Sequence, residues 1–122
     1  MDARQAMQAY AGGRLVLGVG LLTLPAPMLR IWTGRDGDRA GAQVLARAMG
    51  ARDIGLAAGT LLAPRRGDSA KPWLLAGALS DAVDLVATWT ARESLPRVGG
   101  RLVGLMAVGG TLTGLTLACV EE

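Results

Sequence analysis

The last stretch of the chain limits its fold most, because no charged side chain occurs from Leu102 to Val120. As a helix, this stretch is roughly 28 Å long, close to the hydrocarbon thickness of a bilayer. The alternative architecture is a soluble four-helix bundle, in which each helix shows a charged face to water. The polar residues Thr111, Thr113 and Thr116 are of a type that membrane helices tolerate. The stretch therefore predicts a membrane-spanning helix.

Three further apolar stretches precede this one, at residues 5–29, 40–63 and 73–91. The short segments between them hold most of the charge, Gly and Pro, which predicts loops. Pro25 and Pro27 are expected to end the first helix and turn the chain toward Arg30 and Trp32. The sequence thus predicts a single all-α domain over residues 1–122. We expect a four-span transmembrane bundle with helices at approximately 5–29, 40–63, 73–91 and 98–120.

Composition excludes several classes of active site. The chain has no His, so it cannot form a Ser-His-Asp triad or an ordinary His-ligated zinc or haem site. Its one cysteine, Cys119, leaves no pair for a disulfide or a CxxC motif. The net charge of +3 comes from Arg residues scattered between apolar segments, which does not indicate nucleic-acid binding. We expect no enzyme activity, no catalytic residue, no cofactor, no metal and no nucleic-acid partner.

Charged residues inside the predicted helices need partners. A single Arg or Asp at the centre of a membrane helix costs about 2.5 to 3.5 kcal/mol. Asp81 and Asp84 are three residues apart and share one helix face, and an antiparallel neighbour would place Arg52 at a similar depth. A guanidinium can bridge carboxylates, so Arg52 is expected to pair with Asp81 or Asp84, with Arg14 as a second cation. The predicted intramembrane ion network consists of Arg14, Arg52, Asp53, Asp81 and Asp84.

Two interpretations of this network remain open. In the first, it is a permanently paired structural network that fixes how the helices align. In the second, Asp81 or Asp84 exchanges a proton or lies on a substrate pathway, with Arg52 as the countercharge.

Small residues four apart, which are typical of closely packed membrane helices, also occur in two of the predicted helices. They are Ala51, Gly55 and Gly59, then Gly100 and Gly104, and Gly110 and Gly114.

Three short motifs together resemble a known family. They are Arg47-Ala-Met-Gly-Ala-Arg52-Asp53-Ile-Gly-Leu-Ala-Ala-Gly59, then Ser80-Asp81-Ala-Val-Asp84, preceded by Gly13-Arg14-Leu-Val-Leu-Gly18. The chain resembles small bacterial four-helix membrane proteins of a domain-of-unknown-function family, distantly similar to DoxX-like proteins. The resemblance implies an architecture without an established activity, and signature positions at Arg52 and Asp81. The first helix lacks the membrane Glu that a small multidrug-resistance transporter requires.

The expected function is that of a non-enzymatic scaffold or accessory subunit, multi-pass in the inner (plasma) membrane. The alternative is a small proton-coupled transporter or channel using Asp81 and Asp84. Expected partners are the lipid bilayer and a second copy of the chain or a larger membrane protein. Both termini are expected outside the cytoplasm, because the opposite side of the membrane carries more Lys and Arg residues. That side carries Arg30, Arg35, Arg39, Arg92, Arg97 and Arg101, against Arg4, Arg65, Arg66 and Lys71; Trp32, Trp73 and Trp89 are expected at the interfaces.

Overall fold

The computed structural model describes residues 1–121, and within them the chain is all-helical, with no strand. Helices account for 87% of the described residues, so the predicted all-α class is confirmed. In chain order the elements are α1 (Ala3–Thr23), α2 (Pro25–Thr33), the 3₁₀ helix η1 (Gly34–Asp38), α3 (Ala40–Leu62), the 3₁₀ helix η2 (Pro64–Arg66), α4 (Lys71–Thr90) and α5 (Arg97–Val120).

The first predicted helix is wrong in one respect, because residues 5–29 form parts of two helices. Helix α1 ends at Thr23, and α2 begins at Pro25 after a bend of 107°. Proline has no N–H to donate and its ring clashes with the preceding turn, so it ends α1 and is favoured in the first turn of α2. The segment predicted as a loop after residue 29 is instead the remainder of α2 followed by η1.

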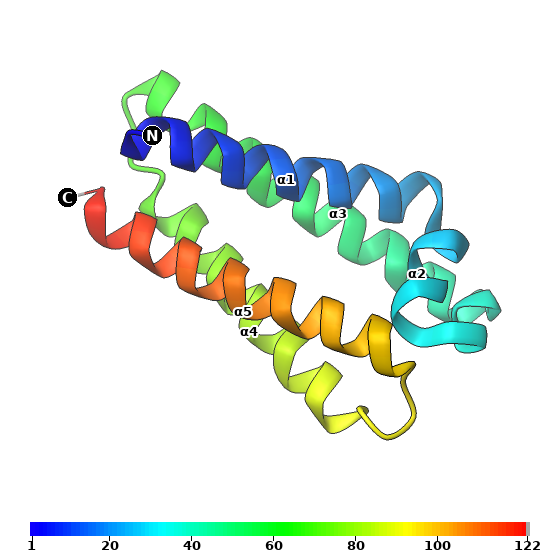
Figure 1. The fold of residues 1–122 in the computed structure, drawn as a ribbon. Coiled ribbons are helices and arrows are strands. Elements are labelled where there is room, and N and C mark those ends of the chain that lie inside the picture. The colour runs from blue at the N-terminus through cyan, green and yellow to red at the C-terminus, as the bar shows by residue number, and fades with distance from the viewer. Residues whose placement is uncertain (122) are drawn as a thin grey trace.

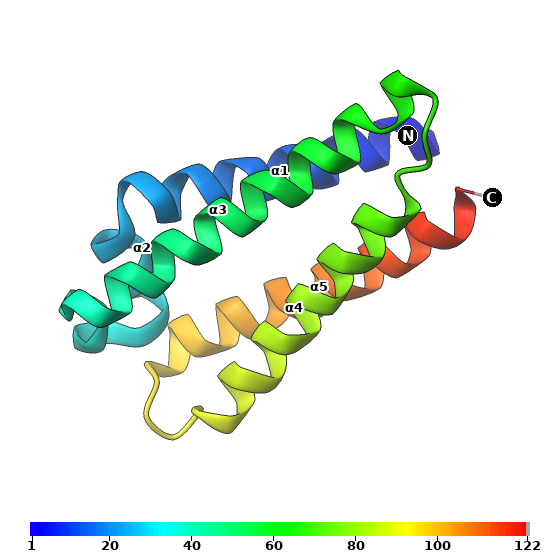
Figure 2. The ribbon, with the colours of Figure 1, turned by 180° about the vertical axis from the view of Figure 1, so that it is seen from behind.

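The four long helices form two closely packed pairs. Helix α1 packs along α3, and α4 packs along α5, whereas contacts between the two pairs are fewer. Both termini and the turn containing η2 lie at one end of the bundle, with α2 and the turn between α4 and α5 at the other (Figure 1). The view from behind shows the same two pairs (Figure 2). Each half of the chain therefore supplies one pair.

Glycine permits the closest approach between α1 and α3. A Cβ atom added to Gly18 would lie 2.8 Å from the carbonyl oxygen of Gly50, and one added to Gly50 would lie 2.6 Å from that of Gly18. The two backbones therefore touch at this crossing. The small-residue pattern predicted in α3 matches only in part, because Gly59 packs against the Trp73 ring but Gly55 has open space around it.

In α5 too, only some of the predicted small-residue positions pack against another helix. Gly110 and Gly114 face α4, where added Cβ atoms would meet Asp81 and Ala78 respectively. A Cβ atom at Gly104 would contact nothing, so this position is not part of a packing face within the chain. Sequence spacing alone does not separate the two cases.

Large apolar side chains are mostly exposed. Within the described residues, Leu74 is the largest side chain that is fully buried, and the other core residues are mainly alanines. Helix α5 is long and apolar enough to cross a membrane, although only 22% of its most apolar stretch is buried. Among the described residues no other single helix is long and apolar enough to do so. Helix α1 together with α2 and η1 is long and apolar enough only if the bent pair is counted as one span.

Candidate functional site

Arg14 lies near the middle of α1 and joins three helices. Its guanidinium is buried, with 7% of the side chain exposed. Nη1 donates to Asp53 Oδ1 of α3 at 2.9 Å, and Nη2 lies 2.5 Å from Asp81 Oδ2 of α4. Nη2 also lies 3.3 Å from the carbonyl oxygen of Gly77. One side chain of the first helix pair thus holds its neighbour α3 and reaches across to the second pair.

Arg52 forms the second link between the pairs. Its Nη2 donates to Asp84 Oδ2 at 3.0 Å and to Asp53 Oδ1 at 3.2 Å. Arg52 is less enclosed than Arg14, because 32% of its side chain is exposed. Asp53 therefore accepts from both arginines, and each arginine also holds one of the two acidic residues of α4.

All five residues of the predicted ion network come together. Of the two carboxylates expected to pair with Arg52, the structure gives it Asp84, while Arg14 takes Asp81. The helix arrangement explains this pairing. Because α1 lies beside α3, Arg14 contacts α4 at Asp81, and Arg52 contacts it one turn later at Asp84. The network contains three carboxylates and two guanidinium groups, which leaves it with a formal charge of −1.

Tyr10 is a further member of the network, and the charge pattern of the sequence does not predict it. Its hydroxyl accepts from Arg14 Nη2 at 2.9 Å and lies 3.5 Å from Asp81 Oδ2. Gly77 and Gly114 make room for it, because a Cβ atom at either position would lie 3.0 Å from the hydroxyl oxygen. The available signal was the spacing, since Tyr10 is four residues before Arg14 and shares its helix face.

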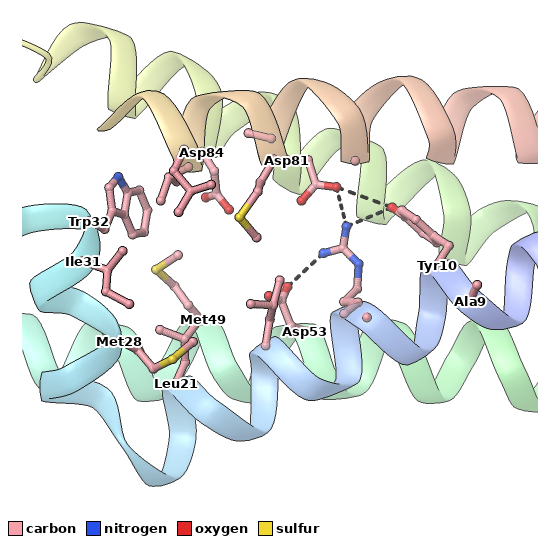
Figure 3. A pocket seen from close by; sticks show the side chains of 18 residues that line it. Ala9, Tyr10, Leu21, Met28, Ile31, Trp32, Met49, Asp53, Asp81 and Asp84 are labelled. Carbon is pink, nitrogen blue, oxygen red and sulfur yellow. Dashed lines mark hydrogen bonds and ion pairs between the residues drawn. The ribbon is translucent and has the colours of Figure 1, made fainter. Parts of the chain in front are cut away.

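A cavity of about 480 Å³ lies beside the network. The charged residues Arg14, Asp53, Asp81 and Asp84 line one part of it, and apolar side chains line the rest. Figure 3 shows Trp32, Ile31, Met28, Met49 and Leu21 toward the α2 end and Tyr10, Asp53 and Asp81 toward the other, with Asp84 between Trp32 and Asp81.

Trp32 contributes to the wall of this cavity. Its ring lines the cavity, and its Nε1 donates to Thr88 Oγ1 of α4 at 3.2 Å. Trp73 and Trp89, by contrast, lie near the two ends of α4 and are 42% and 65% exposed. Helix α2 thus closes one end of the cavity and is fixed to α4 through the indole.

The three carboxylates of the network are not arranged as a metal site. Within residues 1–121, no three His, Cys, Asp or Glu side chains are placed to hold a metal ion. Each of the three carboxylates of the network is already paired with an arginine.

Comparison with known proteins identifies no relative of this chain. No family model matches the chain, and neither does any curated protein or solved structure at a significant level. The resemblance to DoxX-like proteins therefore stays a prediction.

Proposed function

We propose that the chain is an integral membrane protein whose four long helices each cross the inner (plasma) membrane. The supporting observation is that charged side chains are buried and large apolar side chains are exposed, which is the reverse of the arrangement in a water-soluble protein. Arg14 and Asp53 are buried, whereas Leu79 is 66% exposed and Leu105 is 72% exposed. A lipid environment removes the cost of the exposed leucines, and the network compensates the buried charges.

Helix length agrees with this proposal. The long helices contain 21, 23, 20 and 24 residues. At about 1.5 Å per residue, each is long enough for a hydrocarbon layer of about 30 Å. Arg52 and Asp53 of α3 and Asp81 and Asp84 of α4 are paired in the network, whereas Arg47 of α3 lies outside it. Insertion of α3 and α4 therefore depends on the assembled bundle.

The proposed role is non-enzymatic, as a scaffold or accessory subunit. In the structural interpretation, the two arginines are permanently paired and hold the first helix pair against the second. The outer faces of α4 and α5 carry exposed Leu79, Val83, Leu105 and Leu112, which are available to lipid, to a second copy or to a larger membrane protein.

Membrane fractionation tests the location. We expect the protein to stay with the membranes after an alkaline carbonate wash and to be released by detergent, because its apolar side chains would contact lipid. Recovery in the soluble fraction without detergent would contradict the four-span proposal.

The second candidate function is a small proton-coupled transporter or channel. The observation that favours it is the position of Asp81 and Asp84 at the wall of the cavity, in a network with one carboxylate in excess. Intramembrane carboxylates with access to a cavity are typical of proton pathways.

One variant separates the two functions. Changing Arg52→Gln, Asp81→Asn and Asp84→Asn together leaves Arg14 paired with Asp53, so the remaining network is neutral. We expect it to fold and to keep its protein partner under the scaffold proposal. A pH-driven flux that the parent shows in proteoliposomes and the folded triple variant lacks would establish the transporter instead.

A further inference from the structure

The cavity has the size of a small-molecule binding site. Its volume of about 480 Å³ lies within the range of roughly 300 to 1,000 Å³ that is usual for such sites. Most of its wall is apolar, with a few polar groups at one side, which is also the usual composition. Leu21, Met28 and Ile31 are among the apolar residues, and Met side chains adapt to ligands of different shape.

The sign of the charge selects the class of ligand. The ion network has one carboxylate more than it has guanidinium groups, so an anion entering the cavity would be repelled and a monovalent cation would neutralise it. The side chains of Asp81 and Asp84 retain 15% and 20% exposure beside the cavity. Coulomb attraction is stronger in such a partly dehydrated site than in water.

Trp32 supplies a second group that favours a cation. The hydrogen bond to Thr88 fixes its indole at the cavity wall. Trp32 and both carboxylates line the cavity, and Figure 3 shows Asp84 between Trp32 and Asp81. The face of Trp is the aromatic surface that attracts cations most strongly.

The cavity opens between α1 and α5. Leu17 of α1 and Leu102 and Met106 of α5 line it, yet they are 36%, 48% and 45% exposed. These two helices contact each other less than either contacts its own partner in a pair. In the proposed membrane orientation the opening faces lipid, where hydrophobic ions concentrate.

We infer that the cavity binds a hydrophobic organic monocation, with its charge beside Asp84 and Asp81 and its apolar groups toward Leu21, Met28 and Ile31. This binding site goes beyond the proposed scaffold function. It requires the bundle and the network, but not a transport activity.

Binding of two ions of matched shape tests the inference. Tetraphenylphosphonium and tetraphenylborate are nearly identical in size and opposite in charge, and quenching of tryptophan fluorescence reports their binding to the detergent-purified protein. After subtraction of binding to empty micelles, we expect saturable binding of the cation and at least tenfold weaker binding of the anion. Equal affinity for the two ions would overturn the inference.

A carboxylate pair of variants tests the role of charge. Asp84→Asn makes the network neutral while Arg52 keeps Asp53 as a partner, so the affinity for the cation is expected to fall about tenfold. Asp36→Asn is the control, because Asp36 lies in η1 outside the cavity with 64% of its side chain exposed. An unchanged affinity in folded Asp84→Asn would contradict the assignment.

A glycine pair locates the site without altering any charge. Gly13 lines the cavity and Gly12 does not, and a Cβ atom at either would contact nothing. Gly13→Leu is expected to reduce cation binding at least tenfold by filling the opening, whereas Gly12→Leu binds like the parent. Binding that survives Gly13→Leu unchanged would place the cation elsewhere, so the inference can fail even if the Asp84 variant does not fold.

Discussion

Arg14 is the residue on which the arrangement of the helices depends most, because its one guanidinium contacts Asp53, Asp81, Tyr10 and a backbone carbonyl of α4. The sequence identified all five charged members of the network from the cost of burying charge. It could not identify which arginine meets which carboxylate, because that depends on the neighbours of α1. Nor could it identify Tyr10, whose role depends on the space left by Gly77 and Gly114 on other helices.

At the residue scale we predict that Arg14→Ala destabilises the protein more than Arg52→Ala. Removing Arg14 leaves Asp81 without a guanidinium partner in a buried site, which typically costs about 3 to 5 kcal/mol. Arg52 is partly exposed, so its loss is expected to cost less. Thermal unfolding in detergent measures both variants.

The double variant Arg14→Gln with Asp81→Asn is the matched control. It removes one charge of each sign, so it is expected to recover part of the stability lost in Arg14→Ala. An Arg14→Ala protein that unfolds at the temperature of the parent would contradict the assigned role of Arg14.

At the scale of elements, the sequence predicts the helices better than their contacts. The ranges 40–63, 73–91 and 98–120 agree within two residues with α3, α4 and α5. The break at Leu24 was signalled by Pro25, but the separate helix after it was not, because an apolar run can continue through a bend. The contact of Gly18 with Gly50 joins two helices that the small-residue spacing did not relate to each other.

A glycine comparison tests the packing of α1 on α3. Gly50→Leu would press a side chain against the backbone of α1, and overpacking of this kind costs about 1 to 3 kcal/mol or more. Gly55→Leu, five residues later in the same helix, meets open space and is expected to keep the stability of the parent. Unfolding in detergent measures both, and equal loss of stability in the two variants would show that the crossing lies elsewhere.

At the scale of the whole molecule, the basic residues are divided between the two ends of the bundle. Arg30 and Arg35 lie at the α2 end, and Arg65 and Arg66 lie at the end that carries both termini (Figure 1). The six Lys and Arg residues expected on the α2 side exceed the four on the other side, so that end is expected to face the cytoplasm.

Reporters fused to either terminus test this orientation. Because an even number of crossings returns the chain to its starting side, N-terminal and C-terminal reporters are expected to give the same result. A reporter that works only outside the cytoplasm is expected to be active at both. Opposite results at the two termini would exclude four crossings, and activity only in the cytoplasm would reverse the orientation.

The division into two helix pairs has a consequence for how the protein is made. The first pair leaves the ribosome before the second, and in its centre it carries Arg14, Arg52 and Asp53, an excess of one positive charge. The second pair brings Asp81 and Asp84, an excess of two negative charges. Neither helix pair alone has equal numbers of positive and negative charges at its centre. The two pairs are therefore expected to attract each other as soon as both are synthesised. A truncated chain that ends after α3 would retain an uncompensated arginine, a feature by which cellular quality control could distinguish an unfinished molecule from a complete one.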